Sequence, residues 1–249
     1  MRINKKNHYE QQISYFGNEF RNVKTYELLP WQRSYIKRIK EDLLGKNYKN
    51  KTLIDIGTGN GYVAIEIARL GMNTIATDLT LAALENVNKY KKKFKLKNIK
   101  TIHCEADDIP LGDKSVDYIV ANAVLEHIPS EKNTAKEWRR ILKPRGKFFV
   151  AVPLKYKFIL PPFIPINYLH DKRLGHLRRY DLESLRNLFK MKVIKVYYTG
   201  HFIKMIGFMV NLFLQNKELD QVLEKIDRKW DSRRYGSTNI IVVFEKDKK

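Results

Sequence analysis

Residues 53–61, with the sequence LIDIGTGNG, constrain the fold of this chain more than any other segment. An apolar strand carries the acid Asp55 near its end and is followed by the alternating glycines Gly57, Gly59 and Gly61. Glycine lacks a Cβ, so it accepts positive φ and lets backbone N–H groups approach a ligand closely. A helix expected over about residues 62–70 would point its positive N-terminal end at that ligand. The segment therefore predicts a strand, a loop that binds a nucleoside-type ligand, and a helix.

The order of residues in this loop is D-x-G-x-G-x-G. It matches neither the phosphate loop GxxxxGK[ST] nor the dinucleotide fingerprint GxGxxG. A second strand, residues 73–77, ends in Asp78, which lies 21 residues after Gly57. That spacing suits a carboxylate at the tip of the neighbouring parallel strand, where it accepts both ribose hydroxyls of a nucleoside. Asp78 could equally cap the helix that starts at Leu79, and the two roles are compatible.

Two more strands are expected, over residues 101–104 and 116–121, so four strand ends face one crevice. The segments EADDIPL, SVDYIVANAVLEHIP and RILKPRGKFFVAVP follow in that order. Together with the glycine loop they resemble the type 11 group of class I S-adenosylmethionine-dependent methyltransferases, whose patterns run close to GDAxDLPF, FDxVxxxxVLEH and LKPGG. The resemblance is strong over residues 50–155 and looser beyond. Two residues depart from the pattern, Glu105 and Arg145, and a different turn type is expected to accommodate Arg145.

The resemblance implies S-adenosylmethionine as the cofactor. By the match, Glu105 stands where the family has the Asp that binds the adenine amine, and the Ala106 N–H meets a ring nitrogen. Asp107 is a second candidate for the amine, because the longer Glu side chain could redistribute the contact. The predicted cofactor-binding residues are Asp55, Gly57, Gly59, Gly61, Asp78, Leu79, Glu105, Ala106, Asp107 and Asn122.

Residues 171–181, DKRLGHLRRYD, resemble the D-x-x-LGHxRRY segment of type 11-like methyltransferases, some of which are associated with surface-glycan or lipid pathways. The resemblance points to acceptor recognition, with Arg178 and Tyr180 as predicted substrate-binding residues. Methyl transfer is an in-line displacement that needs a base only when the acceptor must lose a proton. His127 and His176 are the candidate catalytic residues, as base or acceptor contact. Each could instead be structural, His127 as a packing residue and His176 through a hydrogen bond to a loop carbonyl.

The predicted fold class is α/β, with a doubly wound, Rossmann-like, seven-stranded sheet that is mostly parallel and has an antiparallel last strand. We expect one domain over residues 1–249, with a helical N-terminal region (1–48), a cofactor-binding core (50–155) and an acceptor-recognition and closing-strand region (156–249). A proline-rich loop is expected after the fifth strand, residues 147–152. A helical insertion over residues 202–229 is expected to precede the last strand, residues 238–245.

The formal net charge is +21, and one cysteine, Cys104, is present. Cys104 cannot form an internal disulfide and is expected to be an inert core residue. No cluster with zinc-ligand spacing is seen, so no metal site is predicted. No signal peptide or apolar stretch of ~20 residues is seen, so a cytoplasmic location is expected, possibly peripheral at the inner membrane face. The charge could come from lysines that merely cover the surface, or it could attract nucleic acid or an anionic membrane.

The leading hypothesis is a methyltransferase that acts on an oxygen or carbon of a small-molecule, glycan or lipid-linked acceptor. The absence of an [ND]PP[YF] tetrapeptide after the fourth strand argues against amino-group methylation of adenine in DNA. RNA methylation is the alternative that the basic surface favours. A non-catalytic protein that binds the cofactor and regulates a partner is the alternative from a different class.

Overall fold

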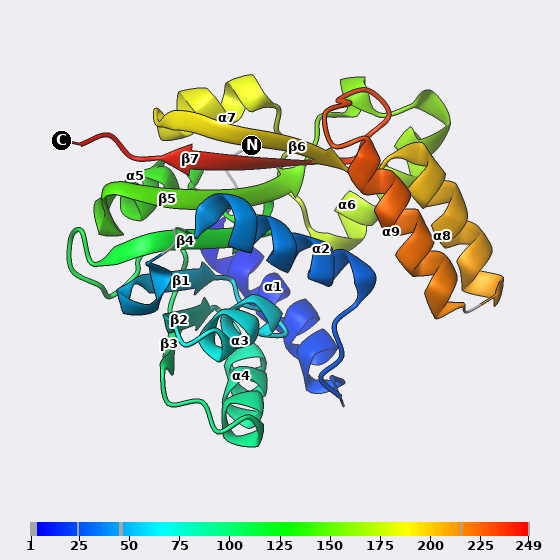
Figure 1. Cartoon of the computed structure of the whole chain (residues 1–249). Coiled ribbons are helices and arrows are strands. Elements are labelled where there is room, and N and C mark those ends of the chain that lie inside the picture. The colour runs from blue at the N-terminus through cyan, green and yellow to red at the C-terminus, as the bar shows by residue number, and fades with distance from the viewer. Residues whose placement is uncertain (1–3, 24, 45–46, 215, 249) are drawn as a thin grey trace.

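A seven-stranded mixed sheet forms the centre of the protein in a computed structural model that describes residues 4–23, 25–44, 47–214 and 216–248. The spatial order is β3-β2-β1-β4-β5-β7-β6. Each pair from β3 to β5 is parallel, and β7 runs antiparallel to both β5 and β6 (Figure 1). The strands are β1 (Thr52–Ile56), β2 (Asn73–Asp78), β3 (Ile99–His103), β4 (Val116–Asn122), β5 (Leu142–Pro153), β6 (Lys192–Thr199) and β7 (Asn239–Glu245). The predicted fold class is confirmed.

Helices cover both faces of this sheet because its central strands are apolar on both sides. The helices are α1 (Lys5–Arg21), α2 (Pro30–Arg38), α3 (Tyr62–Arg69), α4 (Leu81–Lys93), α5 (Glu131–Ile141), α6 (Ile164–Leu174), α7 (Leu182–Phe189), α8 (Phe202–Leu214) and α9 (Lys217–Lys229). On one face, α2 and α3 pack with strand residues such as Leu53 and Val120. On the other face, α5 and α7 pack with Ile54 and Ile119, which are next to Leu53 and Val120 in the sequence. This alternation along each strand fixes the register of the sheet.

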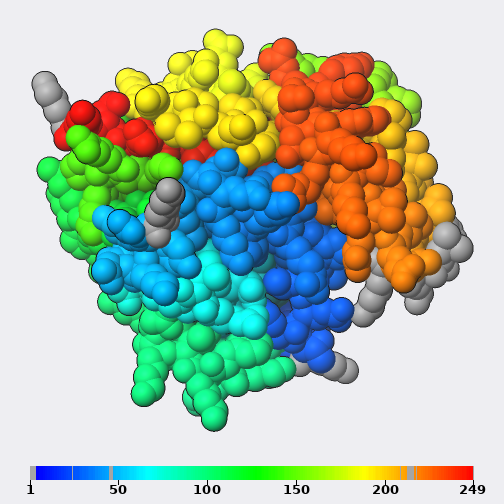
Figure 2. Space-filling view, viewed as in Figure 1, coloured from blue at the N-terminus to red at the C-terminus, as the bar shows by residue number. Residues whose placement is uncertain are grey.

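Helix α1 lies beside the carboxyl ends of β1 and β2 (Figure 1), which is the edge where α/β sheets bind their ligands. Helices α8 and α9 pack against each other at one side of the molecule, where they form a rim in the space-filling view of Figure 2. Among the described residues, no helix combines the length and the apolar character that crossing a bilayer requires.

Two local expectations were wrong. The segment expected to be a proline-rich loop contains α6, which begins directly after the short 3-10 turn Pro161–Phe163 and carries a proline in its first turn, where the missing N–H costs nothing. Arg145 was expected in a turn type without positive φ, but its φ is +57°. Its N–H donates to the Lys246 carbonyl, and this contact with the chain after β7 holds the left-handed conformation.

Candidate active site

A cavity of about 700 Å³, opening included, lies at the carboxyl ends of the parallel strands. Four strand ends and one face of α1 surround it, as the crevice predicted from the sequence requires. Its lining is formed by Tyr9, Gln12, Phe16, Phe20, Ile56, Gly57, Gly59, Thr77, Asp78, Leu79, Thr80, Cys104, Glu105, Ala106, Ala123, Val124, His127 and Ile128. Six of the ten predicted cofactor-binding residues are among them, and Asp55, Gly61, Asp107 and Asn122 are not.

The glycine loop forms one wall of the cavity and is held from behind by Asp55. Asp55 Oδ2 accepts from Thr58 Oγ1 at 2.7 Å and from the Ala64 N–H at 3.2 Å. Burial raises the pKa of Asp55 to about 7. Gly57 has a φ of +64°, and a Cβ built on it would lie 2.4 Å from Val124 Cγ2. The loop therefore needs glycine at this position, and Asp55 shapes the loop without lining the cavity.

Asp78 lies at the tip of β2, as predicted, and its carboxylate organises two loops. Its Oδ2 accepts from the Gly59 N–H at 2.9 Å, and its Oδ1 accepts from the N–H and hydroxyl of Thr80 at 2.8 and 2.7 Å. Burial raises the pKa of Asp78, against the effect of these hydrogen bonds. The N-cap of α4 is Thr80, not Asp78. Asp78 thus lines the cavity with its orientation fixed, and the ribose contact stays a prediction.

The β3 end carries the acids that the resemblance assigns to adenine. Lys5 of α1 forms ion pairs with Glu105 at 2.6 Å and with Asp107 at 2.9 Å, and Tyr9 donates to Asp107 at 3.2 Å. Glu105 lines the cavity, whereas the Asp107 side chain is 4% exposed and outside the lining. The backbone of Ala106 also lines the cavity, and its carbonyl accepts from Trp138. Sequence reasoning missed Lys5, because nothing in its neighbourhood links it to a strand a hundred residues away.

The remaining assigned positions divide between the cavity and the framework. Leu79 lines the cavity. Asn122 donates to the Tyr62 hydroxyl at 2.6 Å, and Gly61 begins α3 with a φ of +76°, so both support the walls. Cys104, expected in the core, is partly buried against the main hydrophobic cluster and also lines the cavity. Burial raises the pKa of its thiol to about 11, so it is protonated at neutral pH.

His127 lines the opposite side of the cavity, in the 3-10 turn Leu125–His127 that follows β4. Its ring contacts Phe16 edge-on at 5.2 Å between centroids and His176 at 4.7 Å. Its Nδ1 is buried, and no described residue forms a hydrogen bond with it. Burial lowers the pKa of His127 to about 3, so the ring is neutral at pH 7.

His176 comes from the loop after α6 and is not in the cavity lining. Its Nδ1 lies 2.8 Å from Asp171 Oδ1, so it bonds a carboxylate and not the predicted loop carbonyl. Asp171 also accepts from Arg179 and Tyr156. Although burial opposes it, these hydrogen bonds hold the pKa of Asp171 well below its ordinary value. The structure thus brings both candidate catalytic histidines together, with His127 in the cavity lining and His176 behind it.

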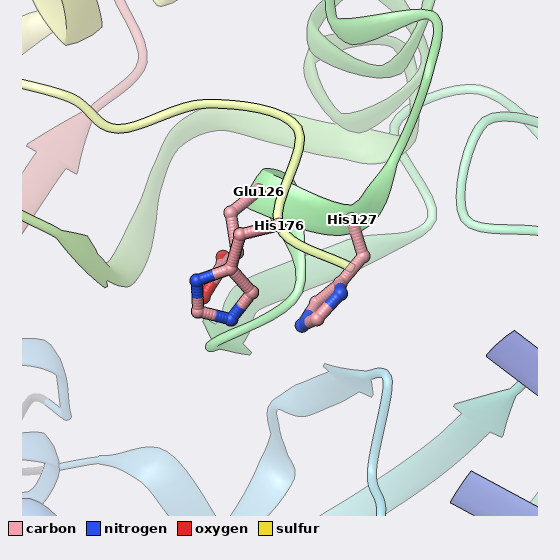
Figure 3. A group of neighbouring side chains, drawn as sticks. All are labelled: Glu126, His127 and His176. Atoms are coloured by element: carbon pink, nitrogen blue, oxygen red, sulfur yellow. The ribbon is translucent and has the colours of Figure 1, made fainter. Parts of the chain in front are cut away.

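Glu126 is a residue that sequence reasoning left without a role in the chemistry. It is fully buried, and neither carboxylate oxygen has a hydrogen-bond partner among the residues that the structure describes. Burial raises the pKa of Glu126 to about 7. Figure 3 shows its side chain beside those of His127 and His176. The one signal in the sequence was an acid directly before His127.

The predicted acceptor contacts are used elsewhere. Tyr180 is 3% exposed, belongs to the main hydrophobic cluster and donates to Glu131 at 3.0 Å. It is a core residue, which argues against the predicted contact. Arg178 donates to the carbonyls of Ile128 and Pro129 and lines a separate surface hollow with His176. Its guanidinium holds the loop that follows β4.

The cavity suits an adenosyl group on chemical grounds. The glycine loop lets a ligand approach the backbone closely. The fixed carboxylate on the next strand can accept hydrogen bonds from ribose hydroxyls, and the end of the third strand can contact the edge of an adenine ring. On the other side of the cavity, the neutral imidazole of His127 is available to a second reactant that binds next to the ribose. The residues present therefore fit a nucleoside cofactor at the strand ends, with a second reactant toward His127.

Comparisons with known proteins agree with this geometry. Residues 54–150 match the family model described as a methyltransferase domain. The chain is 30% identical over 106 residues to the ubiquinone/menaquinone biosynthesis C-methyltransferase UbiE of Rickettsia prowazekii, which covers 40% of this chain and 43% of that protein. It is 28% identical over 125 residues to a probable S-adenosylmethionine-dependent methyltransferase of Mycolicibacterium smegmatis, over 50% of this chain and 47% of the relative.

The chain therefore spans less than half the length of these curated relatives. Among solved structures, geranyl diphosphate C-methyltransferase from Streptomyces coelicolor superposes with a TM-score of 0.71 at 13% identity, covering 96% of this chain and 98% of that one. At this identity the likeness concerns the fold.

Proposed function

We propose that this chain, whose residues 54–150 form a class I methyltransferase domain of the S-adenosylmethionine-dependent type, methylates an oxygen or carbon of a small-molecule, glycan or lipid-linked acceptor. The observation that carries the proposal is the single cavity that joins the glycine loop and Asp78 on one side to His127 on the other. When bound, the cofactor supplies an electrophilic methyl group on sulfur.

The protein's own part is binding and orientation. Asp78 and the Gly57–Gly59 backbone would hold the ribose and the amino-acid portion of the cofactor, and Glu105 and Ala106 the adenine. Holding an acceptor in line with the methyl carbon supplies much of the acceleration. His127 and His176 are the proposed contacts on the acceptor side.

Two observations support a small acceptor. Helix α1 contributes Phe16 and Phe20 to the lining of the cavity, whose surface is mainly apolar. The names of two similar proteins refer to C-methylation, in one case in quinone biosynthesis and in the other of geranyl diphosphate. We extend this to the present chain as an apolar or partly apolar acceptor.

The test is to incubate the protein with radiolabelled methyl donor and separate lipid, glycan and RNA extracts, and to find which fraction carries label. We expect label in the lipid or glycan fraction. Asp78→Asn, which keeps the shape of the side chain, should weaken cofactor binding at least tenfold by calorimetry and reduce labelling at low donor concentration. Asp247→Ala, an exposed position away from the cavity, is the matched control.

RNA methylation is the second candidate, favoured by the net charge of +21. Label confined to the RNA fraction would replace the leading proposal with this one. Tight cofactor binding with no label in any fraction would favour the non-catalytic role.

We also propose a cytoplasmic location with peripheral contact at the inner membrane face, supported by the charge and by exposed Ile206, Met209 and Val210 on α8. The side chains of Phe208 and Phe213, on the same helix, lie outside the described set.

A further inference from the structure

We infer that Glu126, His127 and His176 form a binding site for a divalent transition-metal cation on the acceptor side of the cavity. The three side chains each offer one ligand atom, and these atoms all lie within 4.8 Å of one another. In Figure 3 the side chains come from two segments and converge on one space. The Leu177 N–H donates to the Glu126 carbonyl at 2.8 Å, which ties the two segments together beside the group.

The strongest argument is that these buried polar atoms lack partners. Glu126 is 0% exposed, and in the described part of the chain neither its carboxylate oxygens nor the buried His127 Nδ1 has a hydrogen-bond partner. A buried carboxylate without a compensating partner costs several kcal/mol, so native proteins pair such groups or use them to coordinate metals. A cation held between the three side chains would satisfy the carboxylate and an imidazole together.

Asp171 supplies the outer layer that a metal-binding histidine usually has. It lies 2.8 Å from His176 Nδ1, and Arg179 and Tyr156 fix the carboxylate in turn. A carboxylate that accepts from one ring nitrogen fixes the tautomer in which the other nitrogen presents a lone pair. The Nε2 of His176 is thereby the atom available to a cation.

The ligand set selects the class of cation. Two imidazoles and one carboxylate favour zinc, iron(II), cobalt(II) or nickel(II), whereas magnesium prefers oxygen ligands. Ligands at about 2.1 Å in tetrahedral geometry lie roughly 3.4 Å apart, and the three ligand atoms here all lie within 4.8 Å of one another. Three protein ligands leave a coordination position open, and one of the three, His127, lines the cavity.

At this place the cation would bind and polarise an acceptor oxygen and lower the pKa of a hydroxyl. Solvent water would then take up the proton, and the oxygen would bond to the methyl carbon as the bond from that carbon to the donor sulfur breaks. This role rests on the proposed function, but cation binding does not. The inference departs from the sequence expectation of no metal site, because Glu126 and His127 lie about fifty residues before His176 and show no metal-ligand spacing.

The test uses the full chain, stripped with a chelator and titrated with Co²⁺ while its visible absorption is recorded, and with Zn²⁺ by calorimetry. We expect one ion per chain. Glu126→Gln and His176→Gln should each weaken binding at least tenfold, since both keep size and polarity. His170→Gln is the matched control, because this exposed histidine contacts the His176 ring but does not belong to the group. Circular dichroism confirms that each variant is folded.

Absence of Co²⁺ and Zn²⁺ binding, or equal binding by the Glu126→Gln, His176→Gln and control variants, would overturn the site. Binding of Mg²⁺ alone would overturn the assigned class of cation. Calorimetry with S-adenosylhomocysteine on the same preparations separates the two proposals. Metal binding without cofactor binding contradicts the proposed function alone, and cofactor binding without metal binding contradicts the site alone.

Discussion

Asp55 shows how one residue can be placed correctly from the sequence and still have another use. The strand and loop around it are as predicted, but its carboxylate bonds Thr58 and the Ala64 N–H and does not line the cavity. The folded loop determines which oxygen atoms of a carboxylate already accept hydrogen bonds. A sequence pattern gives the position of such an acid, not its partners.

The buried Asp55 carboxyl predicts a pH effect on stability. Its pKa is about 7 in the folded protein, against the ordinary value of 3.8 that the exposed carboxyl has in the unfolded chain, so between these values only the folded chain keeps the proton. Stability contributed by this group is therefore present at low pH and falls as pH rises toward 7. Asp55→Asn should lack that loss, so its stability relative to the parent rises with pH, by roughly 4 kcal/mol at most.

Urea unfolding of both proteins at pH 5, 6, 7 and 8 measures this difference. The other titrating groups are common to the two proteins, so the difference isolates residue 55. A difference that is constant with pH would show that the folded carboxyl is already ionised.

Gly57 makes a second prediction at this scale. In Gly57→Ala the positive φ costs about 1–2 kcal/mol, and the new methyl group would clash with Val124. Gly71→Ala is the matched control, because Gly71 has a φ of +86° and nothing within 4 Å of a built Cβ. Urea unfolding should show the larger loss at residue 57, and Val124→Ala should recover part of it. Equal losses at both glycines would mean that Val124 moves aside freely.

At the scale of elements, the N-terminal helix α1 closes the cavity through polar contacts with three other segments. Lys5 and Tyr9 hold the β3 end, the His8 ring lies 2.8 Å from the His127 carbonyl, and Gln12 donates to Leu174 at 3.2 Å. Phe16 and Phe20 complete the apolar lining. This helix therefore touches both the donor side and the acceptor side.

Loosening α1 should weaken cofactor binding. The double variant Lys5→Ala with Tyr9→Phe removes the ion pairs and the hydroxyl contact at the β3 end, and we expect a three- to tenfold weaker affinity for S-adenosylhomocysteine by calorimetry. Hydrogen exchange should also be faster in residues 5–21 than in the parent. Lys6→Ala, at the exposed neighbouring position, is the control. Tighter binding by the double variant would mean that Lys5 competes with the adenine amine for Glu105.

Most elements of the core could be predicted because each carries a strong local signal. Strands β1, β2 and β4 are apolar runs with an acid or amide at or directly before the last residue, and α3 begins where the glycine loop predicts. Helix α6 was missed because Pro161, Pro162 and Pro165 read as loop, although Pro165 sits in a first turn. The pairing of Lys5 with Glu105 and the burial of Tyr180 depend on contacts between distant segments, and no local pattern contains them.

For the whole molecule, the densest run of positive charge and the strand-end cavity lie apart. The lysine-rich segment 89–97 ends α4 and leads into β3, at the edge of the sheet opposite the cavity. A surface there can attract an anionic partner without delivering it to the active site. The charge thus favours attachment over substrate selection.

This arrangement predicts binding to anionic vesicles that weakens steeply with salt. We expect cosedimentation with phosphatidylserine-containing vesicles at 50 mM salt and loss of most of it at 300 mM, with little binding to neutral vesicles. Replacing Lys91, Lys92 and Lys93 by glutamine should reduce binding and leave S-adenosylhomocysteine affinity unchanged. Undiminished binding by this variant would place the contact on another surface.

The order of the strands also bears on how the chain is made. Strand β7 is the last in sequence but lies between β5 and β6 in space. A chain that leaves the ribosome N-terminus first can pair β1 to β5 during synthesis, whereas β6 emerges with no neighbour to join. Until residues 239–245 appear, two strand edges stay open, and this interval is when a chaperone or a wrong strand has access to them.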